Sequence, residues 1–193
     1  MHASSDQPSA WVARFAPLIP PGEALDLACG SGRHARLLAA RGLAVSAVDR
    51  DAQALAAAAG KGIATLQHDL ESPGSVWPFP SAHFSAIVVT NYLHRPLFDA
   101  ILASLAPGAV LIYETFAQGN EVFGKPSNPD FLLAPGELLG LAARGGLRVL
   151  AYEDGVVAHP KPARVQRLCA VGPAFDGASG RLDEEALLSG KCN

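Results

Sequence analysis

Apolar runs and helical patterns alternate along most of the chain. Seven runs rich in Ala, Val, Leu and Ile have the length and composition of buried strands. They cover residues 24–29, 44–49, 63–68, 84–90, 109–115, 147–153 and 163–171. Helical spacing or helix propensity predicts helices around residues 11–18, 37–38, 52–59, 96–105 and 135–143. Ser9 is a suitable N-cap for the first of these helices.

Strands that are apolar throughout and separated by helices are typical of a parallel sheet covered on both faces. The last two strands are joined by only a loop, which favours a hairpin. The pattern therefore predicts an α/β fold with a doubly wound, mostly parallel seven-stranded sheet and an antiparallel C-terminal edge hairpin. One domain is expected over residues 1–173. A polar, glycine-rich tail follows at 174–193, where residues 183–188 favour a short helix.

The composition agrees with one folded domain, since 49% of the 193 residues are hydrophobic and 17% are charged. The net charge of −3 disfavours a nucleic-acid partner, which usually requires a basic surface. No apolar run approaches the length of a membrane span, and the polar N-terminus does not resemble a secretory leader. Cys29, Cys169 and Cys192 lack the spacing of a metal site or a disulfide framework. We expect a cytoplasmic protein with reduced thiols, no membrane partner and no metal.

A glycine-rich turn follows the first strand, in the run Ala24-Leu-Asp-Leu-Ala-Cys-Gly-Ser-Gly-Arg-His34. In doubly wound folds the ligand lies at this edge of the sheet. Glycines let the backbone approach the ligand, and the next helix offers free N–H groups. Gly30, Gly32 and Ala35 also satisfy the dinucleotide pattern G-x-G-x-x-A. A nicotinamide cofactor is therefore one alternative.

Three acids lie in or directly after the first three strands. Asp26 lies within a strand, where a buried carboxylate needs compensation. Either the cationic group of a ligand supplies it, or the carboxylate braces a neighbouring loop. Asp49 can accept both hydroxyls of a ribose, and Asp69 can accept the exocyclic amine of adenine, with Leu70 beside the ring. Asp51, in contrast, is expected to cap the following helix.

The run Asp26-Leu-Ala-Cys-Gly-Ser-Gly32 resembles motif I of class I S-adenosylmethionine-dependent methyltransferases, D-x-G-x-G-x-G, with Ala28 at the first glycine. The resemblance spans residues 11–171, and its layout is similar to small single-domain methyltransferases of the TehB type. It implies a Rossmann-like methyltransferase fold and S-adenosyl-L-methionine as cofactor. The cofactor-binding residues that it implies are Asp26, Ala28, Gly30, Ser31, Gly32, Asp49, Arg50, Asp69, Leu70 and Thr90.

The acceptor is expected near the end of the fourth strand, in the run Thr90-Asn-Tyr-Leu-His-Arg-Pro96. His94 is the candidate base because histidine titrates near neutral pH, and its alternative role is a hydrogen bond within the loop. Asn91 and Tyr92 can orient the acceptor. The run lacks the N-P-P-Y arrangement of the family's nucleic-acid amino-methylating members, which favours a small-molecule acceptor.

The segment 116–130 is longer than a connection requires, and such loops often close over a site. Phe116, Asn120 and Phe123 are the expected lid residues, which would cover the acceptor and exclude water. The alternative is an Ω-loop packed on itself. Glu114, just before this segment, is either a substrate group or a paired polar residue.

The predicted function is methyl transfer from S-adenosyl-L-methionine to a small-molecule acceptor by in-line displacement. Two alternatives remain open at this point. One is an NAD(P)-dependent oxidoreductase on the same glycine loop, which leaves Asp26 unexplained. The other is a cofactor-binding module without turnover.

Overall fold

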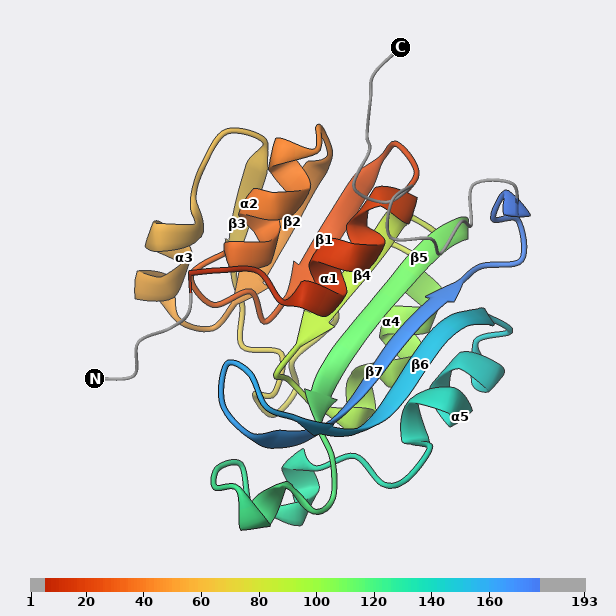
Figure 1. Cartoon of the computed structure of the whole chain (residues 1–193). Helices are drawn as coiled ribbons and strands as arrows, with labels where there is room; N and C mark the ends of the chain where they lie inside the picture. Colours follow the sequence, from red (N-terminus) through yellow and green to blue (C-terminus); the bar gives the residue numbers. More distant parts are fainter. Residues whose placement is uncertain (1–5, 178–193) are drawn as a thin grey trace.

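The computed structural model describes residues 6–177, which form one seven-stranded sheet of order β3-β2-β1-β4-β5-β7-β6. The strands are β1 (Glu23–Leu27), β2 (Ala44–Asp49), β3 (Ile63–Gln67), β4 (Phe84–Thr90), β5 (Leu105–Phe116), β6 (Arg148–Val157) and β7 (Ala163–Val171). The first five pair in parallel, and β7 is antiparallel to both of its neighbours. Figure 1 shows β6 and β7 as the C-terminal hairpin. The predicted fold is confirmed, with β7 inside the sheet and β6 at its edge.

Short helices precede β1 and connect four pairs of successive strands. The α-helices are α1 (Ala10–Phe15), α2 (Arg33–Ala40), α3 (Ala52–Ala58), α4 (Phe98–Ser104) and α5 (Glu137–Arg144). The 3-10 turns are η1 (Ala16–Leu18), η2 (Arg95–Leu97), η3 (Asn120–Val122) and η4 (Pro129–Phe131). The helix predicted at 96–105 therefore begins as η2, which contains Pro96, and continues as α4.

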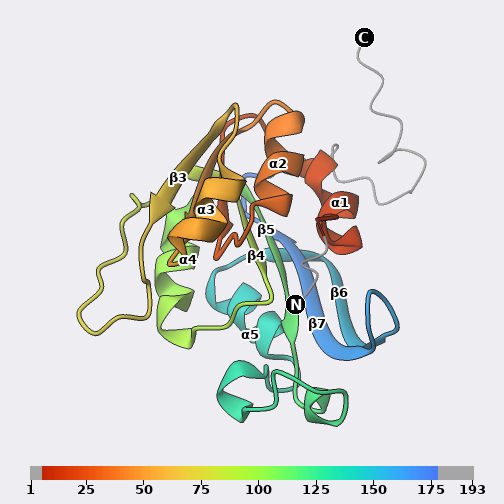
Figure 2. The same cartoon turned by 90° about the vertical axis from the view of Figure 1, so that its left-hand side faces the viewer.

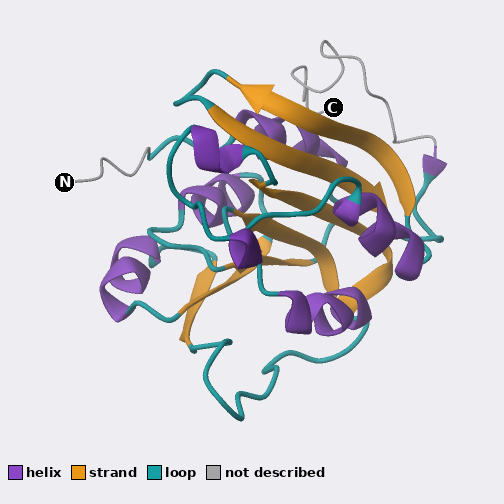
Figure 3. Cartoon of the chain, turned by 90° about the horizontal axis from the view of Figure 1, so that it is seen from below, coloured by secondary structure: helices purple, strands orange, loops and turns teal. Residues whose placement is uncertain are grey.

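Helices cover the sheet on both faces, as the apolar strands predicted. Phe15, Leu38 and Leu55 bring α1, α2 and α3 into one core cluster. Phe98 and Leu141 bring α4 and α5 into a second cluster with the opposite face of the central strands. Figure 3 shows helices on both sides of the strands. Strand β4, in the middle, is buried along its whole length.

Local capping explains where two helices begin. The Ser9 hydroxyl accepts the backbone N–H of Trp11 at 3.1 Å and caps α1. One carboxylate oxygen of Asp51 accepts the N–H groups of Gln53 and Ala54 at 2.8 and 3.2 Å and caps α3. Both caps were expected from the sequence and are confirmed.

Irregular segments follow β3 and β5. Residues 68–83 connect β3 to β4 without a helix, and residues 117–131 leave β5 with two 3-10 turns (Figure 2). None of the helices within residues 6–177 is long and apolar enough to cross a membrane. The short helix expected at 183–188 lies outside the described residues.

Candidate functional site

The turn after β1 places its backbone in the left-handed region at three positions. The φ angles of Ala28, Gly30 and Gly32 are 54°, 53° and 78°. A Cβ atom added to Gly32 would lie 2.5 Å from Cβ of Ala58 in α3, so this position requires glycine. Ala28 occupies a conformation that costs an alanine roughly 1–2 kcal/mol. The turn is therefore close-packed against α3 and strained at Ala28.

Asp49, at the end of β2, holds this turn in place. One carboxylate oxygen accepts the N–H of Gly30 at 2.8 Å, and the other accepts the N–H of Asp51 at 2.9 Å. A carboxylate has about four lone-pair sites, so both oxygens keep acceptor capacity for a ligand. Asp49 thus links the glycine turn to the start of α3 and still faces a cavity.

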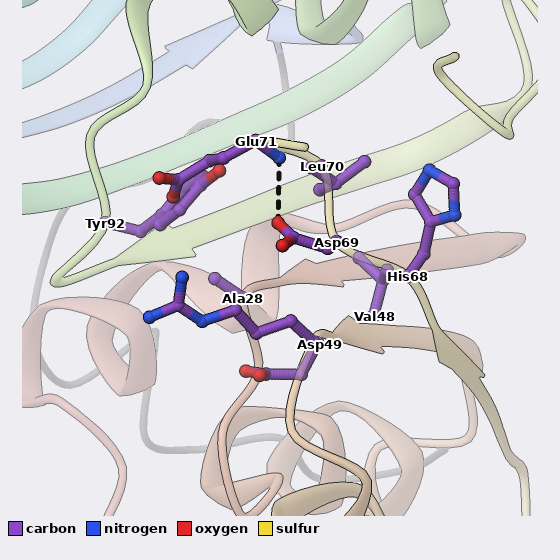
Figure 4. Close-up of a pocket in the computed structure, with 9 residues that line it drawn as sticks. Ala28, Val48, Asp49, His68, Asp69, Leu70, Glu71 and Tyr92 are labelled. Carbon is purple, nitrogen blue, oxygen red and sulfur yellow. Dashed lines mark hydrogen bonds between the residues drawn. The ribbon is translucent and has the colours of Figure 1, made fainter. Parts of the chain in front are cut away.

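The strand-end cavity, as we call it, has a volume of about 190 Å³ at the carboxyl ends of β1, β2 and β3. Figure 4 shows the carboxylates of Asp49 and Asp69 facing it from opposite sides. Its lining residues are Ala28, Val48, Asp49, Arg50, His68, Asp69, Leu70, Glu71 and Tyr92. The structure therefore brings together five of the sequence-predicted cofactor residues, Ala28, Asp49, Arg50, Asp69 and Leu70, with Tyr92 from the predicted acceptor side.

Tyr92 and Glu71 line the strand-end cavity and also a second, neighbouring cavity. Burial, and secondarily the negative charge of Glu71, raise the pKa of Tyr92 above its usual value. The Tyr92 hydroxyl therefore stays protonated at neutral pH and can donate a hydrogen bond. Its backbone carbonyl accepts the hydroxyl of the fully buried Tyr113 at 3.0 Å, which fixes the position of this residue.

Two further cavities continue from this point. The lid cavity, of about 230 Å³, is lined by Glu71, Asn91, Tyr92, Leu93, Thr115, Phe116, Pro126 and Phe131. The hairpin cavity, of about 330 Å³, is lined by residues 7–10, Arg33, Asn91, Glu114, Phe116, Val157, residues 159–161, Ala163, Val165 and Arg167. Glu71 and Tyr92 are shared between the first two cavities, and Asn91 and Phe116 between the last two. One cleft therefore runs along the carboxyl edge of the sheet.

Asn91 stands at the middle of this cleft with a φ of 54°. Its N–H donates to the carbonyl of Glu114 at 2.9 Å, which continues the pairing of β4 with β5 for one more residue. A non-glycine residue in the left-handed region is uncommon, although asparagine tolerates it better than most. Such strained positions cluster at functional sites.

Asp26 lies beneath the glycine turn and is 1% exposed. One of its carboxylate oxygens accepts the N–H of Ala35 in the first turn of α2 at 2.8 Å. Burial raises the pKa of Asp26 to about 7, although this hydrogen bond and Arg33 act in the opposite direction. In the structure the Asp26 carboxylate thus braces the start of α2 through Ala35, and Asp26 does not line the strand-end cavity. Direct contact with a ligand stays a prediction.

His34 was not singled out in the sequence, yet it joins three segments. It is 1% exposed, and burial lowers its pKa to about 3. The backbone N–H of Ser9 donates to its Nε2 at 3.1 Å, so Nε2 carries no proton and Nδ1–H faces the Thr90 hydroxyl at 3.3 Å. Thr90 therefore contacts α2, and it is not among the residues that line the cleft.

Glu114 is the paired polar residue that one of the sequence alternatives described. It lies 2.5 Å from Nε of Arg167 and accepts the hydroxyl of Ser9 at 2.9 Å. Arg167 also contacts Glu153 at 3.2 Å. This network attaches the segment before α1 to β5 and β7.

The predicted lid residues divide into two groups. Phe116 lines both the lid and hairpin cavities. Asn120 is 1% exposed and holds the loop together, because it donates to the carbonyl of Pro126 and accepts the N–H of Arg164, both at 3.0 Å. Phe123 is 41% exposed and does not line the cleft. The segment is thus packed on its own side chains, as an Ω-loop is, and one of its ends still covers the cleft.

Other predicted residues lie beside the cleft. His94 precedes η2, where its carbonyl accepts the N–H of Leu97 at 3.0 Å, and it does not line the three cavities. Of the two roles considered for His94, the structure therefore shows a contact for the hydrogen bond within the loop. Gly30 and Ser31 belong to the turn that Asp49 and Arg36 hold. Within residues 6–177 there is no cluster of three His, Cys, Asp or Glu residues that could hold a metal ion.

Several cleft residues were missed in the sequence. Glu71 follows the predicted adenine segment by one residue and could have been found from that position. Phe131 lies just beyond the predicted lid segment. Arg33 and Lys161 reach the cleft from the start of α2 and from the hairpin loop, and no local pattern joins these two segments.

The fold is similar to that of known methyltransferases. A methyltransferase-domain family model matches residues 24–108, which include the glycine turn, the strand-end cavity and Asn91. TehB from Haemophilus influenzae aligns with a TM-score of 0.69 and 18% identity, over 86% of this chain and 62% of that one. A methyltransferase from Mesorhizobium loti aligns with a TM-score of 0.63 and 17% identity, over 83% and 95% of the two chains. No curated protein matches the sequence.

Another similar structure, the [4+2]-cyclase SpnF, aligns with a TM-score of 0.63 and 16% identity over 84% of this chain and 78% of that one. The fold alone therefore does not determine the reaction. The family match, in contrast, covers the segment that carries the glycine turn and the strand-end acids. Residues 24–108 therefore match a methyltransferase domain, and the fold that surrounds them is similar to that of S-adenosylmethionine-dependent methyltransferases.

Proposed function

We propose that this enzyme transfers the methyl group of S-adenosyl-L-methionine to a small-molecule acceptor by in-line displacement. The observation that supports this most strongly is the continuous cleft along the carboxyl edge of the sheet. Asp49 and Asp69 lie at one end of it, and Asn91 and Phe116 lie beyond Tyr92. Each cavity is small or at the low end of the roughly 300–1,000 Å³ of typical ligand pockets, so a cofactor and an acceptor would share the cleft.

The adenosine part of the cofactor would occupy the strand-end cavity. Asp49 would accept the ribose hydroxyls, since its carboxylate keeps acceptor sites beside the two backbone N–H groups that it binds. Asp69 and Leu70 would contact the adenine. Asp26, Ser31, Gly32 and Thr90 lie outside the cavity lining and would act by holding the glycine turn and α2 in position.

The acceptor would lie in the lid cavity. Leu93, Phe116 and Phe131 give it an apolar wall, and Asn91 and Tyr92 add hydrogen-bonding groups. The cofactor supplies an activated methyl group, so positioning and exclusion of water can provide most of the acceleration. Tyr92 would donate a hydrogen bond, and an acceptor that is nucleophilic as bound would need no general base.

The test begins with the purified chain and a metabolite extract. S-Adenosylhomocysteine should raise the melting temperature more than NAD or NADP does, because a ligand that binds only the native state stabilises it. Incubation of the extract with isotopically labelled S-adenosyl-L-methionine should then label a small molecule. A larger shift with NAD would favour the oxidoreductase alternative, and cofactor binding without label transfer would favour the module without turnover. A cytoplasmic location and the absence of a nucleic-acid partner remain predictions; label in the extract's RNA would contradict the second.

A further inference from the structure

The hairpin cavity is built from three parts of the chain that are distant in sequence. Residues 7–9, which precede α1, and Ala10, its first residue, form one wall, and the loop between β6 and β7 forms another. Arg33, the first residue of α2, closes the cavity toward the glycine turn. Figure 1 shows the segment before α1 and the hairpin loop at the same end of the sheet. The family match ends at residue 108, so it does not describe the hairpin loop.

The charges that line this cavity are mostly positive. Arg33, Lys161 and Arg167 are cationic, and Glu114 is the single carboxylate among the lining residues. Glu114 is bound to Arg167 and to the Ser9 hydroxyl. No ion pair joins Arg33 or Lys161 to a carboxylate in the part of the chain that the structure describes. The lining is thus positive in a protein whose net charge is −3.

The position of Arg33 is unfavourable for the helix that carries it. Cations near a helix N-terminus oppose the helix dipole, and the first turn of α2 contains no acid to offset it. The Arg33 guanidinium also lies 3.5 Å from the carbonyl of Gln7, so it points toward the segment that forms the cavity wall. The positive charge of Arg33 therefore destabilises α2 and contributes to the positive lining of the hairpin cavity.

We propose that the hairpin cavity binds an anionic group of the methyl acceptor, a carboxylate or a phosphate, through Arg33 and Lys161. The inference rests on the proposed function, because the hairpin and lid cavities share Asn91 and Phe116. The apolar part of the acceptor lies against Phe116, and its anionic group faces the hairpin loop. The acceptor is thus a small organic acid or phosphate ester. His159 lines the same cavity and adds a further donor at its rim.

Binding of simple aromatic compounds tests this before the natural acceptor is identified. Benzoate, phenyl phosphate, benzyl alcohol and benzylamine share a ring and differ in charge. With S-adenosylhomocysteine at saturation, ligand-observed NMR should show that the two anions bind more tightly than the alcohol and the amine. The stronger of the two anions identifies carboxylate or phosphate as the preferred group. Equal binding of all four compounds, or preference for the amine, would overturn the proposal.

Variants locate the binding. The double variant Arg33→Gln/Lys161→Gln should weaken binding of the preferred anion by about tenfold, since two ion pairs are lost. Lys61→Gln, whose exposed lysine lies before β3 at the opposite edge of the sheet, should leave it unchanged. Lys61→Gln removes one positive charge and the double variant removes two, so a loss of binding free energy half as large in Lys61→Gln would mean that only the overall charge matters, which contradicts a defined site.

The cofactor's own carboxylate is a competing occupant. If it takes these cations, the double variant weakens S-adenosylhomocysteine binding by a similar factor, and the acceptor proposal is wrong. If S-adenosylhomocysteine does not bind the wild type at all, the proposed function fails first, and the benzoate and phenyl phosphate titrations still report whether the cavity binds anions. In the labelled extract, a methylated compound that passes an anion-exchange column unretained would refute the inference and leave methyl transfer intact.

Discussion

The backbone N–H of Ser9 donates a 3.1 Å hydrogen bond to Nε2 of His34, which attaches the segment before α1 to the first turn of α2. The same serine donates its hydroxyl to Glu114, at the end of β5. These bonds close one side of the hairpin cavity with the chain before α1. Because Nε2 must stay unprotonated to accept this bond, the attachment depends on pH.

We predict that His34 makes acidification destabilising. Burial lowers its pKa to about 3 from about 6.5, so its contribution is fully present above pH 6.5 and is lost as the pH falls toward 3. The loss amounts to about 1.4 kcal/mol per pH unit for one proton. Chemical denaturation between pH 7 and pH 4 should show that His34→Gln removes this component. An unchanged pH profile in the variant would contradict the assignment.

Asp26 should have the opposite dependence. Burial raises its pKa to about 7 from 3.8, so its contribution is fully present below pH 3.8 and is lost as the pH rises through 7. Between pH 4 and pH 6.5 the two buried groups nearly cancel in the wild type. Asp26→Asn keeps an acceptor for the Ala35 N–H and removes the titration. This variant should therefore lose stability on acidification more steeply than the wild type, and a shallower profile would refute the prediction.

Ala28→Gly should stabilise the protein by about 1 kcal/mol, because glycine adopts the left-handed conformation without the strain of a Cβ atom. The φ angle of Ala28 is 54°, and this alanine stands where the family motif has glycine. Ala82→Gly is the matched control, since Ala82 has a φ of 50° in an exposed turn before β4. Both variants should raise the melting temperature. Only Ala28→Gly should change S-adenosylhomocysteine affinity, because only Ala28 lines the strand-end cavity.

The strand-end part of the site could be predicted because each of its acids directly follows a strand in the sequence. Asp49 and Asp69 each follow a parallel strand, and parallel strands end at one edge of the sheet. The hairpin cavity was not predicted. Arg33 and Lys161 are distant in sequence, and they line one cavity because β7 lies between β5 and β6 in the sheet. The sequence also left two roles open for Asp26. The choice depends on the distance to the Ala35 N–H, which residue type alone does not determine.

Asp49→Ala should weaken S-adenosylhomocysteine binding by about 1.5–3 kcal/mol, because a charged acceptor of the ribose hydroxyls is removed. The structure adds a second effect, since Asp49 also binds the N–H groups of Gly30 and Asp51. The melting temperature should therefore fall as well. Asp51→Ala is the control, because it removes the α3 cap at a cost of about 1 kcal/mol without facing the cavity. Calorimetric titration that gives both variants the same affinity would make Asp49 a structural residue only.

Asn120→Ala should separate the stability of the lid segment from cofactor binding. The buried amide of Asn120 is bonded to the carbonyl of Pro126 and the N–H of Arg164, and its loss leaves both groups without their partner. Both groups are partly buried, so each unpaired group costs at most about 1–3 kcal/mol, and the melting temperature should fall. Pro126 and Phe131 line the lid cavity, and their displacement should reduce turnover while S-adenosylhomocysteine affinity is retained. Asn128→Ala is the control, because the side chain of exposed Asn128 accepts the N–H of Asp130 at 3.1 Å within its own turn. If Asn120→Ala keeps its stability but loses cofactor binding, the segment belongs to the cofactor site and not to the acceptor side.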